Sequence, residues 1–400
     1  MKFLFFIGGW NFGGMETAYL SLMKGLKTLG HQPVAIVCGW TDGIVPELLE
    51  QAGIPCHQLR LGRIYLRNPY WTWHTLWRMP AARWRLRRLA AELRPDWVIF
   101  AELQMVLMVA SLLPARRAIY LQSEPGRLMQ HGWSKRAIER RLDRFVCVTD
   151  FIARNLPTGR RKIAVVHNGV ELPNAMPSEH APVRVGIVGR ITNQKQHLVL
   201  LEACALLKRG SFELHIVGTK SGTYVRDVES RIAALNLGDT VRWTGFVADC
   251  DVLHGSLDIV AAPAIDEPFG LTVPEAGSYG LPVVAARSGA FPEIVESGVN
   301  GLMFEPGNAG DCAQNAAASH RRPGLASPPR RCRTCACRRR LHHRDDGDPL
   351  PRGARLLNSG LQGIAGTGRA PDRVPEGPPN RICTMPATMP IDTPNRQARS

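Results

Sequence analysis

Apolar residues in the first 318 positions form short continuous runs that alternate with longer stretches of three-to-four periodicity. The short runs predict strands, and the periodic stretches predict helices. Continuous apolar strands separated by helices indicate parallel sheets covered on both faces. The predicted strands are residues 3–7, 34–38, 97–100, 118–121, 145–148 and 163–166, then 183–188, 213–217, 240–243, 258–262 and 282–285.

The strand series restarts after a polar, proline-bearing stretch at residues 171–178, which reads as a linker. We therefore expect an α/β chain with two doubly wound, Rossmann-like domains facing across a cleft. The expected divisions are a first domain at 1–172, a linker at 173–182, a second, incomplete domain at 183–318 and a tail at 319–400.

The tail differs from the rest in composition, with 16 Arg, no Lys and 6 acidic residues in 319–400. Two interpretations stay open: a frameshift near residues 311–318, which would leave an inactive transferase if the body is one, or a natural disordered basic tail. Its cluster of Cys332, Cys335, Cys337, His342 and His343 lacks a paired second half, so we expect no metal site.

The whole chain carries a formal charge of +16, which suits anionic partners such as phosphates or an acidic membrane surface. Its first apolar run is short and meets a glycine loop, so no signal peptide is expected. No run is long enough to span a membrane. Six cysteines scattered through the body are expected as reduced thiols.

Glycines follow the first predicted strand, at Gly13 and Gly14, with Glu16 three positions after the first of them. The spacing is not that of a dinucleotide fingerprint. Glycine would let the backbone approach a ligand closely, and Glu16 would cap the first helical turn. The alternative is a plain turn and helix start.

Two cations follow the first strand of the second series, Arg190 at its end and Lys195 entering the next helix. An arginine fork and a lysine point charge suit a diphosphate. The carboxyl ends of parallel strands are where such folds bind ligands. The alternative is a solvated basic loop.

Two carboxylates, Glu267 and Glu275, lie eight positions apart around the turn Pro268-Phe269-Gly270-Leu271. Glu275 falls near a predicted helix start, where it would accept hydrogen bonds from sugar or ribose hydroxyls. The alternative is a surface charge followed by an acid favoured by the helix dipole.

These motifs together resemble glycosyltransferase family 4, whose members are retaining, nucleotide-sugar-dependent transferases of the GT-B fold. The resemblance covers about residues 2–315. It also rests on three further stretches, which are His167-Asn168-Gly169-Val170, Gly280-Leu281-Pro282-Val283-Val284-Ala285 and Pro292-Glu293-Ile294-Val295 with Asn300-Gly301-Leu302.

The resemblance implies roles for these residues. Arg190 and Lys195 would bind the donor diphosphate, and Glu267 would lie at the donor sugar, so these three are the expected catalytic residues. The expected donor-binding residues are Glu275, Gly13, Gly14, Asn168, Phe269, Gly270 and Leu271. No metal or other cofactor is expected, because preorganised cations stabilise the departing diphosphate.

One position departs from the family pattern. Gln122 stands where many members carry a histidine that contacts the sugar; glutamine donates hydrogen bonds but does not titrate near neutrality. We expect Gln122, Glu124 and Glu16 to contact the sugar or the acceptor.

Arginines and aromatic residues are interleaved at positions 60–94. This mixture suits an anionic membrane surface, or an acidic glycan or nucleic acid. The alternative is an ordinary helix with its tryptophans inward and its arginines outward.

The expected function is transfer of a hexose from a nucleotide sugar to a glycan or lipid-linked acceptor, in surface polysaccharide or lipopolysaccharide synthesis. We expect a cytoplasmic protein with peripheral membrane contact through 60–94 and no nucleic-acid partner. A sugar-nucleotide epimerase, a phosphorylase and a non-catalytic nucleic-acid-binding protein are the alternatives from other classes.

Overall fold

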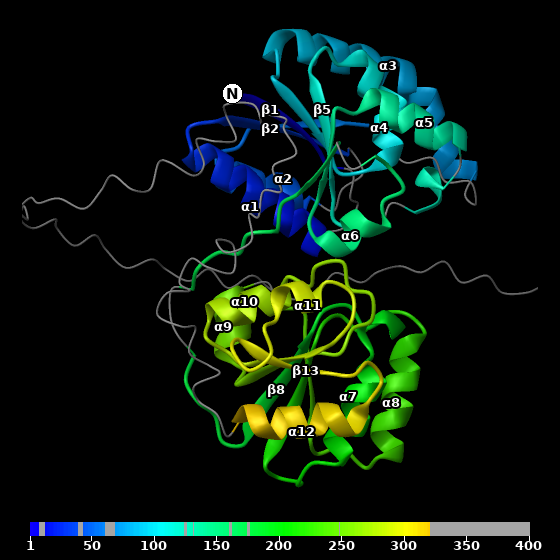
Figure 1. The fold of residues 1–400 in the computed structure, drawn as a ribbon. Coiled ribbons are helices and arrows are strands. Elements are labelled where there is room, and N and C mark those ends of the chain that lie inside the picture. Colours follow the sequence, from blue (N-terminus) through cyan, green and yellow to red (C-terminus); the bar gives the residue numbers. More distant parts are fainter. Residues whose placement is uncertain are drawn as a thin grey trace, which may run out of the picture. The chain divides into compact units, whose positions relative to one another are not determined.

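The computed structural model describes residues 1–7, 13–38, 43–60, 69–123, 126–130, 132–159, 162–173, 177–247 and 249–320. Residues from 321 onward, with the Cys/His cluster of the basic tail, therefore lie outside the described residues. Figure 1 shows two α/β domains in chain order, each with its own sheet and helices; the first is coloured blue to green and the second green to yellow.

The first sheet has seven strands in the order β3-β2-β1-β4-β5-β6-β7, and every described pairing is parallel. Its strands are β1 (Lys2–Ile7), β2 (Gln32–Cys38), β3 (Cys56–Leu59), β4 (Trp97–Phe100), β5 (Arg116–Leu121), β6 (Arg144–Cys147) and β7 (Ile163–Val165). The helices are α1 (Gly14–Thr28), α2 (Ile44–Gln51), α3 (Pro69–Leu93), α4 (Leu103–Val109), α5 (Gly132–Arg141) and α6 (Asp150–Asn155), with short 3-10 turns η1 (Ala110–Leu112) and η2 (Gly126–Met129).

A buried tyrosine ties this sheet to its first helix. Tyr19 of α1 is fully buried, and its hydroxyl donates to the Tyr120 carbonyl oxygen at 2.7 Å. Its ring meets those of Phe5 and Tyr120 edge-on. Burial raises the pKa of Tyr19, so this hydroxyl stays a donor.

The second sheet has six parallel strands in the order β10-β9-β8-β11-β12-β13. Its strands are β8 (Val183–Val188), β9 (Phe212–Val217), β10 (Val241–Gly245), β11 (Ile259–Ala262), β12 (Val283–Ala286) and β13 (Gly301–Phe304). Its helices are α7 (His197–Ala205), α8 (Tyr224–Ala234), α9 (Cys250–Gly255), α10 (Thr272–Ser278), α11 (Phe291–Ile294) and α12 (Ala309–His320), with the turn η4 (Asn193–Lys195) before α7.

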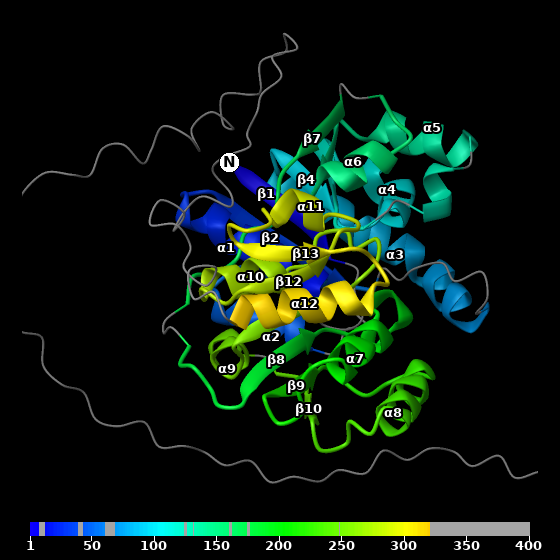
Figure 2. The same cartoon turned by 60° about the horizontal axis from the view of Figure 1, so that its bottom comes forward.

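Both faces of this sheet are covered, as the continuous apolar strands predict. Ile259 and Ala261 of β11 belong to one core cluster, while Val260 and Ala262 belong to another. Helices α7 and α12 pack on the first face, and α10 contacts β11 and β12. Figure 2 shows α12 crossing this second sheet.

The fold class and all eleven predicted strands are confirmed, within one or two residues at each end. Two strands were missed, β3 and β13, and both lie at sheet edges. An edge strand buries only one flank, so Cys56-His57-Gln58-Leu59 carries polar positions and lacks a continuous apolar run. The predicted domain limits at 172, 182 and 318 stay predictions.

The inward-tryptophan interpretation of residues 60–94 is wrong for the described tryptophans of α3. Trp73, Trp77 and Trp84 are all exposed. The helix turns small and aliphatic residues inward instead, which lets it approach the sheet closely, and these include Ala82, Leu86 and Ala90. No helix among the described residues is long and apolar enough to cross a membrane.

Candidate active site

Glu267 and Lys195 meet at the carboxyl ends of two adjacent strands. Glu267 lies in the loop between β11 and α10, and Lys195 ends η4 after β8. The Lys195 ammonium donates to Glu267 Oε2 at 3.0 Å, with 21% and 14% of the two side chains exposed. The strand order brings together residues 72 positions apart, and both keep an accessible polar edge.

The backbone of Glu267 is held by a tight turn at residues 288–291. The Ala290 amide donates to the Glu267 carbonyl oxygen at 2.9 Å, and Ser288 Oγ accepts from the Asp266 amide at 3.0 Å. A Cβ on Gly289, whose φ is +58°, would overlap the backbone of Glu267. Gly289 therefore permits a contact that any other residue would block.

Gly270 crowds the same loop from the other side. Its φ is +74°, and a Cβ there would lie 2.5 Å from a Phe291 ring carbon and 3.1 Å from Glu267 Cγ. The predicted donor-binding role of Gly270 is untested. Its position next to the Glu267 side chain gives it a structural reason to be glycine.

Arg190 is the second residue after β8, and its side chain is exposed. Between it and the strand, Gly189 adopts a φ of +136°, and a Cβ there would lie 3.3 Å from Lys195 Cε. A Cβ on the neighbouring Gly218 would collide with the Gly189 carbonyl oxygen. Gly189 and Gly218 thus allow the sharp turn after β8, from which the chain continues to Arg190 and Lys195.

Glu275 lies in α10, 17% exposed, with its Oε2 3.8 Å from Nε2 of His254. His254 is completely buried, and its ring lies 4.8 Å from that of Tyr279. Both His254 nitrogens lack a hydrogen bond among the described residues. Glu275 therefore sits over a buried, uncommitted imidazole, with part of its carboxylate open to solvent.

Gln122 and Asn168, predicted as separate contacts, face each other in the first domain. Each amide donates to the other's oxygen, at 3.0 Å and 2.9 Å. The Tyr120 hydroxyl also donates to Asn168 Oδ1 at 2.7 Å. Gln122 is thereby fixed at the end of β5. Glu124 lies outside the described residues.

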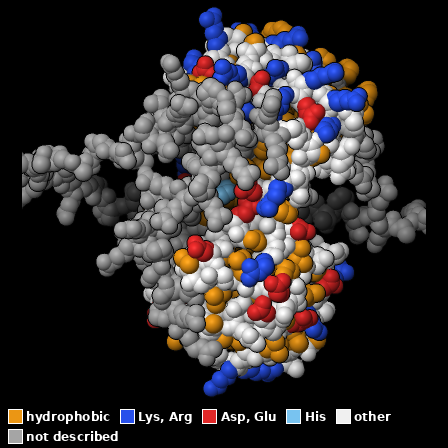
Figure 3. All heavy atoms as spheres, in the orientation of Figure 1, with side chains coloured by type: hydrophobic (Ala, Val, Ile, Leu, Met, Phe, Trp, Pro, Cys, Tyr) orange, Lys and Arg blue, Asp and Glu red, His pale blue; other side chains and the backbone are white. Residues whose placement is uncertain are grey.

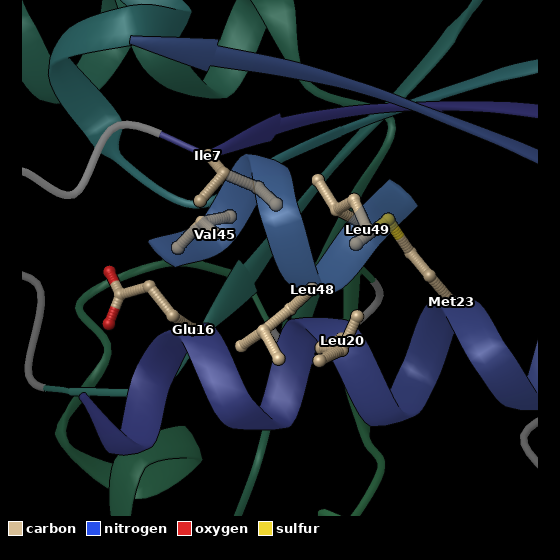
Figure 4. Close-up of a pocket in the computed structure, with 7 residues that line it drawn as sticks. All are labelled: Ile7, Glu16, Leu20, Met23, Val45, Leu48 and Leu49. Atoms are coloured by element: carbon tan, nitrogen blue, oxygen red, sulfur yellow. The ribbon is translucent and has the colours of Figure 1, made fainter. Parts of the chain in front are cut away.

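Gly13 and Gly14 begin α1, and Gly14 lies 3.5 Å, measured from an ideal Cβ, from Leu271 of the second half of the chain. Glu16 is buried, and its carboxylate lies at one end of a packing gap between α1 and α2 that Figure 4 shows. The gap has no room for a water molecule and is otherwise lined by aliphatic side chains. It is no ligand pocket; a contact of Glu16 with the acceptor stays a prediction.

The loop that carries Glu267 also touches the first half of the chain. Phe269 is buried within the first core cluster, and its ring lies 6.1 Å from that of His167. Thr149 Oγ1 donates to the Pro268 carbonyl oxygen at 2.9 Å. The Phe269 side chain is therefore buried in the protein core, and only the backbone of this loop lies beside the Glu267 side chain.

Glu293, which belongs to a motif without an assigned role, caps α6. Its two carboxylate oxygens accept from the backbone amides of Asp150 and Phe151 at 2.8 and 2.6 Å. Arg154 Nη2 donates to the same carboxylate at 3.1 Å. The first amides of a helix have no partner inside it, so a carboxylate from elsewhere satisfies them.

Sequence reasoning missed the residues that hold the predicted ones in place. Gln194 accepts from the Ile265 amide at 3.0 Å and donates to the Asp266 carbonyl oxygen at 3.3 Å. Ser288 and His254 were also missed. Gln194 and Ser288 hold Asp266, the residue before Glu267, and His254 lies beside Glu275. These contacts join distant parts of the chain, and no short-range pattern marks them. Among the described residues, no group of three or more His, Cys, Asp and Glu could hold a metal ion.

The candidate site consists of Arg190 and Lys195 after β8, Glu267 in the loop after the neighbouring strand β11, and Glu275 on α10. Comparison with known proteins identifies the family of the chain. The "Glycosyltransferase Family 4" model matches residues 12–173, and the "Glycosyl transferases group 1" model matches residues 172–319. The chain belongs to glycosyltransferase family 4, with the GT-B fold.

Among curated relatives, D-inositol 3-phosphate glycosyltransferase of Mycobacterium sp. (strain KMS) is 32% identical over 191 residues, covering 43% of each chain. The chain thus spans half or less of the length of the curated relatives it matches. Among solved structures, Anabaena Alr3699/HepE in complex with UDP and glucose aligns with a TM-score of 0.69 and 21% identity, covering 84% of this chain and 94% of the other. The lipopolysaccharide outer core galactosyltransferase WaaB aligns with a TM-score of 0.60 and 19% identity, covering 82% and 94%.

We predict that Gly270→Ala destabilises the protein more than Gly245→Ala does. Both glycines have nearly the same left-handed φ, +74° and +76°, but a Cβ on Gly245 meets nothing within 4 Å. The backbone strain is therefore common to both, at about 1 kcal/mol. The collision with Phe291 and Glu267 should add about 1–3 kcal/mol for Gly270 alone. Urea unfolding of the two variants measures this difference, and equal losses would show that the loop yields freely.

We also predict that His197 weakens the fold in mild acid. This residue begins α7, two positions after Lys195, and is buried with its ring 6.1 Å from that of Tyr224. Burial, and then the Lys195 charge, lower the pKa of His197 to about 4, against an opposing hydrogen bond to Thr192. The unfolded chain takes up this proton near pH 6.5, so stability should fall as pH drops from about 6.5 towards 4, by about 3 kcal/mol in all.

Unfolding free energies measured across that pH range for the natural chain and His197→Gln check the prediction. The variant should lose this part of the slope even if it is less stable at pH 7. Parallel curves for the two proteins would assign the acid sensitivity to other groups.

Proposed function

We propose that this protein is a retaining glycosyltransferase that moves a hexose from a nucleoside-diphosphate sugar to a glycan or lipid-linked acceptor. The observation that carries the proposal is the Lys195–Glu267 pair, held beside exposed Arg190 at the carboxyl edge of the second sheet. Similarity to a protein solved with UDP and glucose supports a nucleotide sugar as donor.

The chemistry follows from charge. When the bond between the anomeric carbon and the diphosphate breaks, negative charge grows on the departing phosphate oxygen and positive charge on the sugar ring. Lys195 and Arg190 stabilise the phosphate charge. Glu267, next to Lys195, faces the sugar side and stabilises the ring charge or binds its hydroxyls. Fixed charges of this kind require no reorganisation at the moment of reaction.

Glu275 holds the nucleoside in this proposal. The partly exposed carboxylate of Glu275, near the start of α10, accepts hydrogen bonds from the two ribose hydroxyls, as acids do in other doubly wound folds. Gln122 and Asn168 offer amide groups to the sugar or the acceptor, from the end of the first sheet.

The acceptor class is proposed from the names of similar proteins. The curated relatives are named for D-inositol 3-phosphate, and one solved neighbour is a lipopolysaccharide galactosyltransferase. The second of these names suits an enzyme of surface glycan synthesis, and the first adds inositol phosphate to the acceptors to be tested. We propose such a role at the cytoplasmic face of a membrane, where lipid-linked acceptors are held.

Calorimetric titration with UDP, GDP and ADP is the first test, and we expect tight binding of one nucleotide. Glu275→Ala should weaken that binding about 10- to 100-fold, the usual loss for a hydrogen bond to a charged group. Incubation with the matching sugar nucleotide and an acceptor panel that includes inositol phosphate should then give product with the donor's anomeric configuration by NMR.

Lys195→Gln and Glu267→Gln should each lower turnover about 100- to 1,000-fold, the usual loss on removing one charge-stabilising group. Lys208→Gln is the matched control for Lys195→Gln, because Lys208 is exposed in the connection between α7 and β9, at the opposite edge of the sheet, and its change removes the same charge. Equal activity of Lys195→Gln and the control, or a product of inverted configuration, would refute the proposed chemistry.

A further inference from the structure

Helix α3 turns its aromatic residues away from the protein. Trp73, Trp77 and Trp84 are 65%, 74% and 61% exposed. At 100° per residue these three positions lie within about 40° of one another around the helix axis. The rings of Trp73 and Trp77 stack at 6.4 Å, so they form one continuous surface. We call these three residues, with exposed Tyr70 and Leu76, the aromatic face.

The aromatic face is a concentration of apolar surface, not a scatter. Fifteen large hydrophobic side chains are exposed among the described residues, and five of them belong to this one helix. The others are distributed singly, such as Leu206 and Phe246 in the second half of the chain. Single exposed apolar residues are normal, whereas a contiguous patch marks a surface that binds something.

Positive charge borders the aromatic face. Helix α3 contains five arginines and one glutamate. Three of the arginines are committed: Arg78 to His74, Arg83 to the Met108 carbonyl oxygen and Arg88 to Glu92. Arg85 and Arg87 are exposed and have no ion pair or hydrogen bond among the described residues. In Figure 3, Lys and Arg side chains mix with hydrophobic ones on the surface where Figure 1 places α3.

The charge selects the partner. A second copy of this chain would bring another positive face, and residues 319–400 carry an excess of arginine as well, so both would be repelled. A single-stranded nucleic acid matches the charge, but proteins that stack its bases hold it in a groove, and an outward helix face offers none. An anionic lipid surface matches both features, because tryptophan prefers the headgroup boundary and arginine binds lipid phosphates.

We propose that α3 docks this protein onto an anionic lipid surface. The helix lies along the interface, with Trp73, Trp77 and Trp84 entering the boundary between headgroups and acyl chains and Arg85 and Arg87 facing the phosphates. This mode lies on the membrane without crossing it. It names the helix that would hold the protein at the membrane face of the proposed function, and it is argued from this surface alone.

The test uses the full chain and vesicles of equal parts phosphatidylglycerol and phosphatidylcholine, with pure phosphatidylcholine vesicles for comparison. Co-sedimentation at about 0.1 M salt measures the affinity. We expect binding to the anionic vesicles only. Trp73→Ala/Trp77→Ala should weaken it at least about tenfold, because this change removes buried area without changing charge.

Charge is tested by an equal-charge pair of variants. Arg85→Gln/Arg87→Gln should weaken vesicle binding roughly 10- to 30-fold. Lys208→Gln/Arg226→Gln removes the same charge from exposed positions in the second half of the chain and should leave it within about twofold. The basic tail is common to all these proteins, so it does not affect the comparison. Leu206→Ala/Phe246→Ala is the matched control for the tryptophan variant.

The inference is wrong if the natural chain ignores anionic vesicles, or if the α3 variants bind them as well as their controls do. It is also wrong if the α3 changes abolish RNA binding but not vesicle binding, or convert a dimer to a monomer in light scattering. Calorimetric titration with UDP separates this result from the catalytic proposal, since the α3 variants should keep the nucleotide affinity of the natural chain.

Discussion

The site depends on the close approach of two backbone turns at the edge of the second sheet. The loop that follows β11 carries Glu267, and the turn that follows β12 lies so near it that Gly289 has no space for a side chain. The Ala290 amide and the Ser288 hydroxyl fasten the two segments together. Parallel neighbours end at the same sheet edge, so these loops are adjacent by topology. Glycine then allows them to touch.

The Lys195–Glu267 ion pair lies beside these turns. Lys195 and Glu267 are neither fully buried nor fully exposed, so pairing compensates for part of their lost hydration. An ammonium group has three donors, and Glu267 accepts from one of them. In the proposed reaction, the remaining donors would bind a phosphate oxygen while the pair stays intact.

Much of the fold could be predicted from the sequence because strand and helix signals are local. The central strands read as unbroken apolar runs. The edge strand β3 did not, because it carries His57 and Gln58, whereas β13 is a four-residue apolar run that the pattern analysis did not pick out. The site residues could be named because they follow strands, but their partners could not. The pairing of Gln122 with Asn168 and the position of His254 under Glu275 depend on contacts between distant segments. For residues 60–94, composition alone left two orientations open, and only the packing of Ala82, Leu86 and Ala90 against the protein shows that the described tryptophans of α3 face outward.

Phe269 links the two halves of the chain in a way that bears on folding order. It lies in the loop that carries Glu267, in the second half, yet its ring is part of the hydrophobic core of the first. Without the first half, this large apolar side chain would be exposed to solvent. We therefore expect the Glu267 loop to take its observed conformation only when the two halves are packed together, so that assembly of the halves and order in this loop are coupled.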